Sequence, residues 1–209
     1  MLTRLKTTPT QALQVWSDAD SRMLGADAEG GQPITGFWYD EASALNVWAD
    51  MSHLVPWEGR SSVRHVSYFV SPMRDAGGQQ ASDDRVAADA EALMAGHVAG
   101  RLWPSACRPD GTMDWSLLTD PEQRTGAERM AAQYVRANVS PTERYVLSVA
   151  DSTRFRLPAN ETDHFPNLFL AGDWTRNGLN CGCMEAAVTS GLLAARALGG
   201  LEMTMARYD

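Results

Sequence analysis

The sequence lacks an excess of basic residues: it carries 18 Lys and Arg against 26 Asp and Glu, a net charge of −8. Nucleic-acid binding needs a basic face that neutralises phosphates, so this charge balance argues against DNA or RNA as a partner.

Cysteine is also scarce. The three cysteines, Cys107, Cys181 and Cys183, are too few for a disulfide-stabilised small domain, and no further Cys or His stands at metal spacing from the Cys-x-Cys pair. We therefore expect no metal site, while a reactive-thiol role stays open.

Long hydrophobic runs are absent as well. No apolar stretch approaches the length of a transmembrane helix, and residues 1–6 lack the apolar core of a signal peptide. We therefore expect a cytoplasmic protein without a transmembrane segment. The composition that is present, 44% hydrophobic and 21% charged residues over 209 positions, is typical of a globular chain with one large or two small domains.

Apolar periodicity and turn residues predict a mixed α/β (α+β) fold with an antiparallel sheet of about three strands. Strands are predicted at 34–39, 44–51 and 63–70 for the sheet, with further short strands at 144–148 and 169–172. Helices are predicted at 8–23, 83–102 and 184–198, the second with Ser82 as its cap, and 127–137 is a short helix or mixed segment. Loops are expected at 25–33 and 105–125.

The string Asn167-Leu-Phe-Leu-Ala-Gly-Asp-Trp-Thr175 predicts a buried strand that ends in a carboxylate. Gly172 permits a close backbone approach, and Asp173 at the strand's end can accept hydrogen bonds from sugar-like hydroxyls. Thr175 could add a hydroxyl. This strand would place polar groups where ligands collect in open α/β sheets.

A glycine-punctuated loop and a helix follow this strand, in the sequence Gly178-Leu-Asn-Cys-Gly-Cys-Met-Glu-Ala-Ala-Val-Thr-Ser-Gly191. If the helix begins near Gly182, its first N–H groups and its positive dipole end can stabilise an anion or an electron-rich ring oxygen. The alternative is an ordinary strand–loop–helix in which Asp173 caps a turn and the glycines only shape it. Glu185 is interpreted as a favourable first-turn charge, with a general base as the alternative.

Taken in order, these residues resemble the C-terminal signature of the flavin-containing amine oxidase and phytoene desaturase superfamily, with matches over 167–175 and 185–195. The resemblance implies that Asp173 contacts the ribityl–pyrophosphate part of FAD and that Gly182 to Met184 abut the flavin ring. It implies the following cofactor-binding residues: Gly172, Asp173, Trp174, Thr175, Gly182, Cys183 and Met184.

A looser resemblance to the substrate-domain strands of phytoene-desaturase-like oxidoreductases covers segments between 45 and 148. It implies a substrate-binding-like domain over 1–150, with an apolar small-molecule substrate. Residues 151–209 would then be the C-terminal strand–helix segment of a Rossmann-like FAD domain. The implied reaction is hydride transfer to the flavin, and the resemblance gives no catalytic residue.

The sequence departs from that family at one point. No segment fits the strand, G-x-G-x-x-G turn and helix that bind the ADP half of FAD, because Gly25, Gly30 and Gly31 have the wrong spacing. The chain is therefore expected to be a fragment, a subunit completed by a partner chain that supplies the G-x-G-x-x-G half, or a descendant without flavin. A non-catalytic partner or regulatory subunit is the alternative to an oxidoreductase.

The remaining aromatic and ionisable residues are assigned mainly structural roles. The seven tryptophans are interpreted as core or sheet-face residues, with lining of an apolar pocket as the alternative. The four histidines have no nucleophile or zinc spacing and are interpreted as structural. Arg154 and Arg156 are expected on a solvated strand edge, with an anionic ligand group as the alternative.

Overall fold

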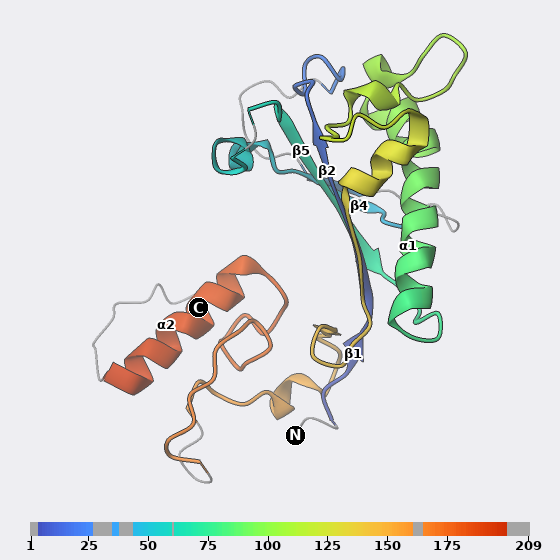
Figure 1. The fold of residues 1–209 in the computed structure, drawn as a ribbon. Helices are drawn as coiled ribbons and strands as arrows, with labels where there is room; N and C mark the ends of the chain where they lie inside the picture. Colours follow the sequence, from blue (N-terminus) through green and yellow to red (C-terminus); the bar gives the residue numbers. More distant parts are fainter. Residues whose placement is uncertain (1–3, 27–34, 38–43, 60, 161–164, 200–209) are drawn as a thin grey trace. The chain divides into compact units, whose positions relative to one another are not determined.

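The structure, a computed structural model, describes residues 4–26, 35–37, 44–59, 61–160 and 165–199. The chain divides into two compact units (Figure 1). The sheet unit comprises Pro9–Glu143, and the loop unit combines Met1–Thr8 with Arg144–Asp209.

The sheet unit contains a five-stranded antiparallel sheet. Its strands, in spatial order, are β3 (Thr35–Phe37), β4 (Val47–Asp50), β5 (His65–Pro72), β2 (Thr10–Ser17) and β6 (Tyr134–Asn138). The predicted strands at 44–51 and 63–70 are confirmed, and that at 34–39 is confirmed for the three residues that the structure describes. The predicted antiparallel pairing is confirmed too, although the sheet has two strands more than expected.

Strand β2 shows that the helix predicted over 8–23 is wrong. Leu13 and Trp16 have helical spacing, but Leu13 and Val15 also alternate as in a strand, and both are fully buried. β2 lies between β5 and β6, with Leu13 opposite Phe69 on one side and Val135 on the other. Pairing along both edges satisfies the backbone of this segment, so tertiary context overrides the helical pattern.

Helix α1 (Gln79–Leu93) lies along one face of the sheet and continues as a π-helical stretch, Met94–Leu102 (Figure 1). Trp103 ends it, as predicted. The following apolar residues of these two stretches are buried: Val86, Ala90, Leu93, Met94 and Val98. The predicted start was wrong, because Gly78 caps the helix, while Ser82 lies within it and its Oγ accepts the Ala76 N–H at 3.1 Å.

The core of the sheet unit lies between this helix and the sheet. It contains large side chains that are fully buried, among them Leu13, Leu45, Phe69, Met94 and Trp103. Trp48 and Trp103 are buried, as expected of core tryptophans, whereas Trp57 is 79% exposed. Short 3-10 turns supply the connections: Ser52–Trp57, Pro104–Ala106, Trp115–Leu117 and Gly126–Ala132. The last of these precedes β6, so of the two alternatives expected for 127–137, a short helix or a mixed segment, the mixed segment is the one found.

The described part of the loop unit has little regular structure apart from one long helix. Strand β1 (Thr7–Thr8) pairs antiparallel with β7 (Tyr145–Val146), a 3-10 turn covers Thr153–Phe155, and α2 spans Met184–Gly199. The strand predicted near 144–148 and the helix predicted at 184–198 are confirmed. No helix in the described part of the chain is long and apolar enough to span a bilayer.

The buried strand predicted at 169–172 is wrong. Phe169 forms one isolated bridge with Asn160, and the preceding Leu168 is 39% exposed. The described residues place no strand beside this segment to form a ladder with it, so an apolar run that suits a buried strand stays an extended loop segment.

Candidate functional site

The segment 172–183, called the glycine loop from here on, leads directly into α2. Its first residue has φ +129°, and the Trp174 indole occupies the space that a Cβ on Gly172 would need. The Gly172 carbonyl accepts hydrogen bonds from both the N–H and the hydroxyl of Thr175, at 3.1 and 2.9 Å. Only glycine can start this tight turn, because any other side chain would overlap Trp174.

Ser190 ties the glycine loop to α2. Its hydroxyl accepts the Gly172 N–H at 3.0 Å and lies 2.6 Å from the fully buried Thr175 hydroxyl. The Thr175 hydroxyl is therefore engaged inside the loop, where it fixes the position of Gly172.

The Asp173 carboxylate differs from its neighbours in having no partner. Among the residues that the structure describes, no hydrogen bond or ion pair reaches its side chain, which is half-buried. Its backbone carbonyl, in contrast, accepts from Arg156 at 2.8 Å and from the Asn177 amide at 3.5 Å. The backbone is thus held from two sides while the carboxylate remains available to a ligand.

Arg156 is the side chain that holds this backbone. It is 1% exposed, and besides Asp173 it donates to the Val146 carbonyl at 3.5 Å and the Ser148 hydroxyl at 3.3 Å. Its Nε has no partner among the described residues. The expected solvated strand edge is therefore wrong for Arg156. A buried guanidinium must find acceptors, and here backbone carbonyls supply them.

Asn177 organises the middle of the glycine loop. Its side-chain oxygen accepts the N–H groups of Leu179 and Asn180 at 3.1 and 2.9 Å, and its amide donates to the Ala186 carbonyl at 3.2 Å. Sequence reasoning did not predict this role of Asn177, and it placed Arg156 on a solvated edge rather than beneath the glycine loop. The Asn177-Gly178 pair was a local signal for a turn, but no local signal marked Arg156.

The predicted site residues Gly182, Cys183 and Met184 lie where the loop becomes α2. Gly182 donates its N–H to the Tyr145 hydroxyl at 3.0 Å, and a Cβ there would overlap the Tyr145 ring. Met184 is 80% exposed. The N–H groups of Met184 and Glu185 have no acceptor in the described part of the chain, as expected for a first helical turn. The structure thus gathers the predicted residues in one loop and the helix start that follows it.

A second polar feature, the polar cleft, lies in the sheet unit. It encloses about 590 Å³, and residues that line it include Asp18, Ser61, Ser62, Thr119, Asp120 and Arg129. Sequence reasoning did not find this cleft, because its walls come from distant segments.

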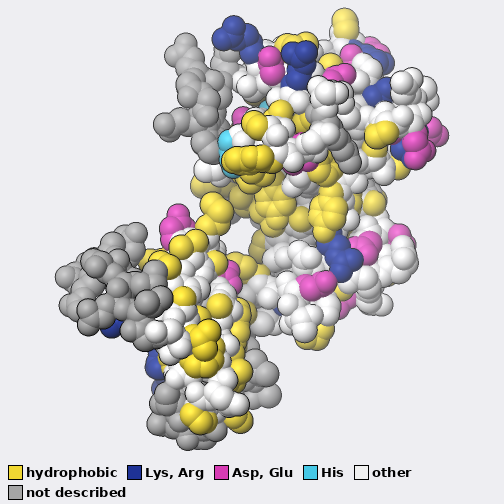
Figure 2. Space-filling view, turned by 60° about the vertical axis from the view of Figure 1, so that its left-hand side comes forward, with side chains coloured by type: hydrophobic (Ala, Val, Ile, Leu, Met, Phe, Trp, Pro, Cys, Tyr) yellow, Lys and Arg dark blue, Asp and Glu magenta, His cyan; other side chains and the backbone are white. Residues whose placement is uncertain are grey.

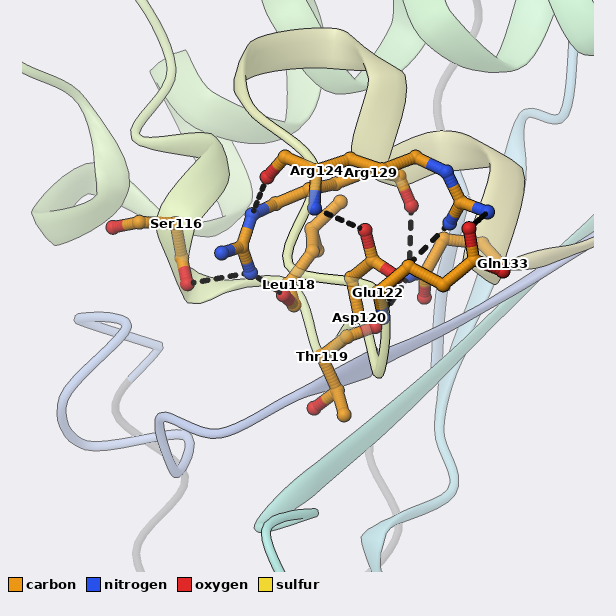
Figure 3. A network of polar contacts seen from close by, with 8 residues as sticks. All are labelled: Ser116, Leu118, Thr119, Asp120, Glu122, Arg124, Arg129 and Gln133. Carbon is orange, nitrogen blue, oxygen red and sulfur yellow. Dashed lines mark hydrogen bonds and ion pairs between the residues drawn. The ribbon is translucent and has the colours of Figure 1, made fainter.

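A network of hydrogen bonds fixes one wall of the polar cleft (Figure 3). Arg129 donates to the carbonyls of Leu118 at 2.6 Å and Arg124 at 2.8 Å. Asp120 accepts from the Arg124 N–H and guanidinium at 2.8 and 2.9 Å. Burial raises the pKa of Asp120, but these hydrogen bonds and the Arg124 charge outweigh it, and the net effect is a lowered pKa. The ionised groups that shape this wall are therefore already paired within the protein.

His65 forms a buried cluster on β5, in keeping with the structural role expected for it. Its two ring nitrogens lie 2.8 Å from the hydroxyls of Ser52 and Ser67, and its Nδ1 is 3.8 Å from the Asp50 carboxylate. Burial lowers the pKa of His65, and the negative charges of Asp50 and Asp20 offset this only in part. Because both nitrogens are engaged, the ring acts as an internal hydrogen-bonding bridge.

Comparison with known proteins agrees with the resemblance of the glycine loop. No curated protein and no solved structure matches the chain. Residues 128–199 match the model of one family, described as flavin containing amine oxidoreductase. The matched stretch contains the whole glycine loop and α2. Residues 128–199 are therefore similar to part of the flavin containing amine oxidoreductase family.

Proposed function

We propose that this chain supplies the flavin-facing part of an FAD site in an oxidoreductase of the amine oxidase and phytoene desaturase type. The observation that carries the proposal is the unpartnered Asp173 carboxylate, set on a backbone that Arg156 and Asn177 hold in place. This carboxylate lies in the segment that matches the flavin-dependent family.

The donor set fits FAD. An unpartnered carboxylate suits the ribityl hydroxyls, which are hydrogen-bond donors, and the unsatisfied N–H groups at the start of α2 suit an electron-rich carbonyl. Gly172 and Gly182 let the backbone form tight turns, because larger residues would overlap Trp174 and Tyr145. Bound FAD would supply the redox chemistry, accepting a hydride from a C–H or C–N bond of an apolar substrate.

The roles of the chain's own residues follow from these contacts. Asp173 would orient the cofactor by accepting hydrogen bonds from its hydroxyls. Gly182 to Met184 would bring the positive end of the α2 dipole toward the ring, which favours negative charge there. Thr175, Ser190 and Trp174 would keep the turn at Gly172 closed. No described residue of the loop is assigned as a proton acceptor, since hydride transfer does not require one.

The proposal includes a partner for the ADP half of FAD. No part of the sequence has the G-x-G-x-x-G pattern, so a partner chain or a further segment would have to supply it. The same observation favours a second candidate function, that of a non-catalytic partner or regulatory subunit that keeps this fold without flavin. If the chain is part of an oxidoreductase, residues 1–150 would contribute the substrate-binding part.

A flavin titration tests the proposal. Purified protein, alone and co-expressed with any partner that a neighbouring gene encodes, is titrated with FAD, FMN and riboflavin while visible absorbance and flavin fluorescence are recorded. Because the proposed contacts reach the ribityl and ring portions, we expect the chain alone to bind all three weakly and with similar affinity. We expect the co-expressed complex to retain FAD.

Two matched variants locate the site. Asp173→Asn should weaken flavin binding about tenfold, the loss expected when one charge-assisted hydrogen bond is removed. Asp151→Asn, the same change at an exposed position of the same unit, should bind flavin as the wild type does. Colourless protein in both preparations with no response to added FAD would sink the flavin proposal and favour the non-catalytic partner.

A further inference from the structure

We propose that Cys181 and Cys183 form a reversible dithiol–disulfide couple at the start of α2, which small-molecule disulfides such as oxidised glutathione oxidise. The two Sγ atoms lie 3.6 Å apart, close to van der Waals contact. A disulfide requires about 2.05 Å, so the two sulfurs need to approach by about 1.5 Å to bond.

The residue between the cysteines is fixed by a contact from β7. The Tyr145 hydroxyl accepts the Gly182 N–H at 3.0 Å and donates to the Gly182 carbonyl at 3.4 Å. The Tyr145 ring covers the side where a Cβ would stand. The two thiols therefore flank a clamped glycine, and the fold holds them facing each other before any reaction.

Both thiols are half-buried and thus open to a small reagent, as is the third free cysteine, Cys107, in the sheet unit. The Cys107 Sγ donates to the carbonyl of its neighbour Arg108 at 3.7 Å. No second thiol of the described residues lies beside Cys107. It therefore serves as an internal comparison for a thiol of similar exposure without a partner.

The disulfide would be labile rather than structural. It closes a ring of only three residues, which restricts the unfolded chain far less than a long loop does. Exposed disulfides are also the ones that exchange readily with small thiols. The Ala186 N–H lowers the pKa of Cys183, but burial, the Cys181 thiol and the Glu185 carboxyl outweigh it and raise the pKa overall.

The reaction balances with one oxidant molecule. The thiolate of one cysteine attacks oxidised glutathione, whose S–S bond breaks, and a mixed disulfide forms while one glutathione leaves. The second cysteine then attacks the protein sulfur of this mixed disulfide and displaces the second glutathione. Two electrons pass from the protein sulfurs to glutathione, and the two thiol protons end on the two released glutathione molecules.

Oxidation would act on the first turn of α2. In the dithiol form the Cys183 Sγ accepts the Ala186 N–H at 3.4 Å. Drawing this sulfur toward Cys181 removes that acceptor, so the helix start loses one of its few capping contacts. The couple would thereby link the local redox state to the order of the helix start.

Glutathione titration of the flavin-free, full-length chain tests the inference. Cys107→Ser protein is equilibrated with defined ratios of reduced and oxidised glutathione, quenched by acid, alkylated and mapped by mass spectrometry. We expect an internal Cys181–Cys183 disulfide that forms at high oxidised glutathione and reverts on adding dithiothreitol. Its equilibrium constant should be at least several-fold higher in the native protein than in urea, because the fold holds the thiols together.

Single-cysteine variants provide the matched comparison. Cys181→Ser and Cys183→Ser, each in the Cys107→Ser background, should form only a mixed disulfide with glutathione. In the oxidised pair, amide hydrogen exchange at Ala186 should be faster than in the dithiol. The inference is overturned if the native pair stays reduced, if both cysteines accumulate glutathione without an internal bond, or if the native and urea constants agree. None of these outcomes depends on whether the chain binds flavin.

Discussion

The sheet unit and the loop unit are each stabilised by a different kind of interaction. In the sheet unit, large apolar side chains such as Leu13, Phe69 and Trp103 are fully buried. In the described part of the loop unit the buried apolar residues are only Leu5, Ala159 and Ala186. There Arg156, Asn177 and Ser190 fix the chain through bonds to backbone groups and to other side chains. Hydrophobic burial thus dominates one unit, and polar contacts shape the other.

Helix α2 of the loop unit leaves several apolar side chains exposed. It buries Ala186 and Ser190, while Met184, Val188 and Leu198 are 80, 63 and 71% exposed. Hydrophobic side chains are spread over the surface of the unit that contains α2 (Figure 2). An apolar helix of this kind gains stability when another surface covers it. Under the proposed function, the dinucleotide-binding half would provide that surface.

The largest expected effect tests the apolar core of the sheet unit. Phe69→Ala should lower the free energy of unfolding by about 3–5 kcal/mol, because it leaves a cavity at the centre of the sheet. Phe165→Ala makes the same change at a 58% exposed position of the loop unit and should cost less than about 0.5 kcal/mol. Urea unfolding followed by circular dichroism measures both. Equal losses would contradict the contrast between the units.

The next effect tests the polar framework of the loop unit. Arg156→Met should destabilise the loop unit by about 2–4 kcal/mol, because three acceptors lose a charged donor inside the protein. Arg154→Met is the control, since that guanidinium is exposed and lies 4.9 Å from the Phe155 ring. Hydrogen exchange over residues 172–183 provides the measurement. Unchanged protection in Arg156→Met would show that the loop does not depend on this side chain.

These contrasts also explain how far the fold could be predicted from the sequence. The sheet strands near 44–51 and 63–70 were predictable because aromatic and β-branched residues cluster there. Strand β2 was not, because Leu13 and Trp16 fit a helix equally well and only pairing with β5 and β6 decides. The prediction of a strand at 169–172 was wrong for the opposite reason. The composition of this segment suits a buried strand, but a strand also needs neighbouring strands to pair with.

The candidate site likewise contains some residues that could be predicted from the sequence and others that could not. The Gly172-Asp173 turn and the helix start at Gly182 to Met184 were predictable because their residues are consecutive. Arg156 and Tyr145 were not, since each acts on a residue far away in the sequence: Arg156 on Asp173, and Tyr145 on Gly182. Local patterns can therefore locate such a loop, but the contacts that hold it depend on the three-dimensional fold.

Glycine substitutions in the loop unit should have opposite signs. Gly182→Ala should cost about 1–3 kcal/mol, because its methyl group would overlap the Tyr145 ring. Gly191→Ala lies inside α2 with no atom within 4 Å of the new Cβ, so it should stabilise by about 0.5–1 kcal/mol. Thermal unfolding measures both. Adding Tyr145→Ala should relieve most of the Gly182→Ala loss; if it does not, the clash is not the cause.

A pH effect on stability is expected from His65 in the sheet unit. The pKa of His65 is lowered in the folded protein, mainly by burial, so the unfolded chain binds the proton more readily. Its contribution is fully present above the unfolded pKa of about 6.5 and is lost as the pH falls below it. The free energy of unfolding should therefore be lower at pH 5 than at pH 7.5. His65→Gln, which cannot titrate, should be less stable throughout and should lose this part of the pH dependence.

The smallest stability effect is expected at the residue with the clearest proposed role. Asp173→Asn removes a carboxylate that has no partner among the described residues, so the free energy of unfolding should change by less than about 0.5 kcal/mol. Flavin binding should nevertheless weaken, because the amide is a poorer acceptor for ribityl hydroxyls than the carboxylate. Chemical unfolding and flavin titration of the same preparation separate the two effects. A clear loss of stability would instead show that the Asp173 carboxylate serves the fold, as Arg156 does, and the proposed division of labour within the glycine loop would fail.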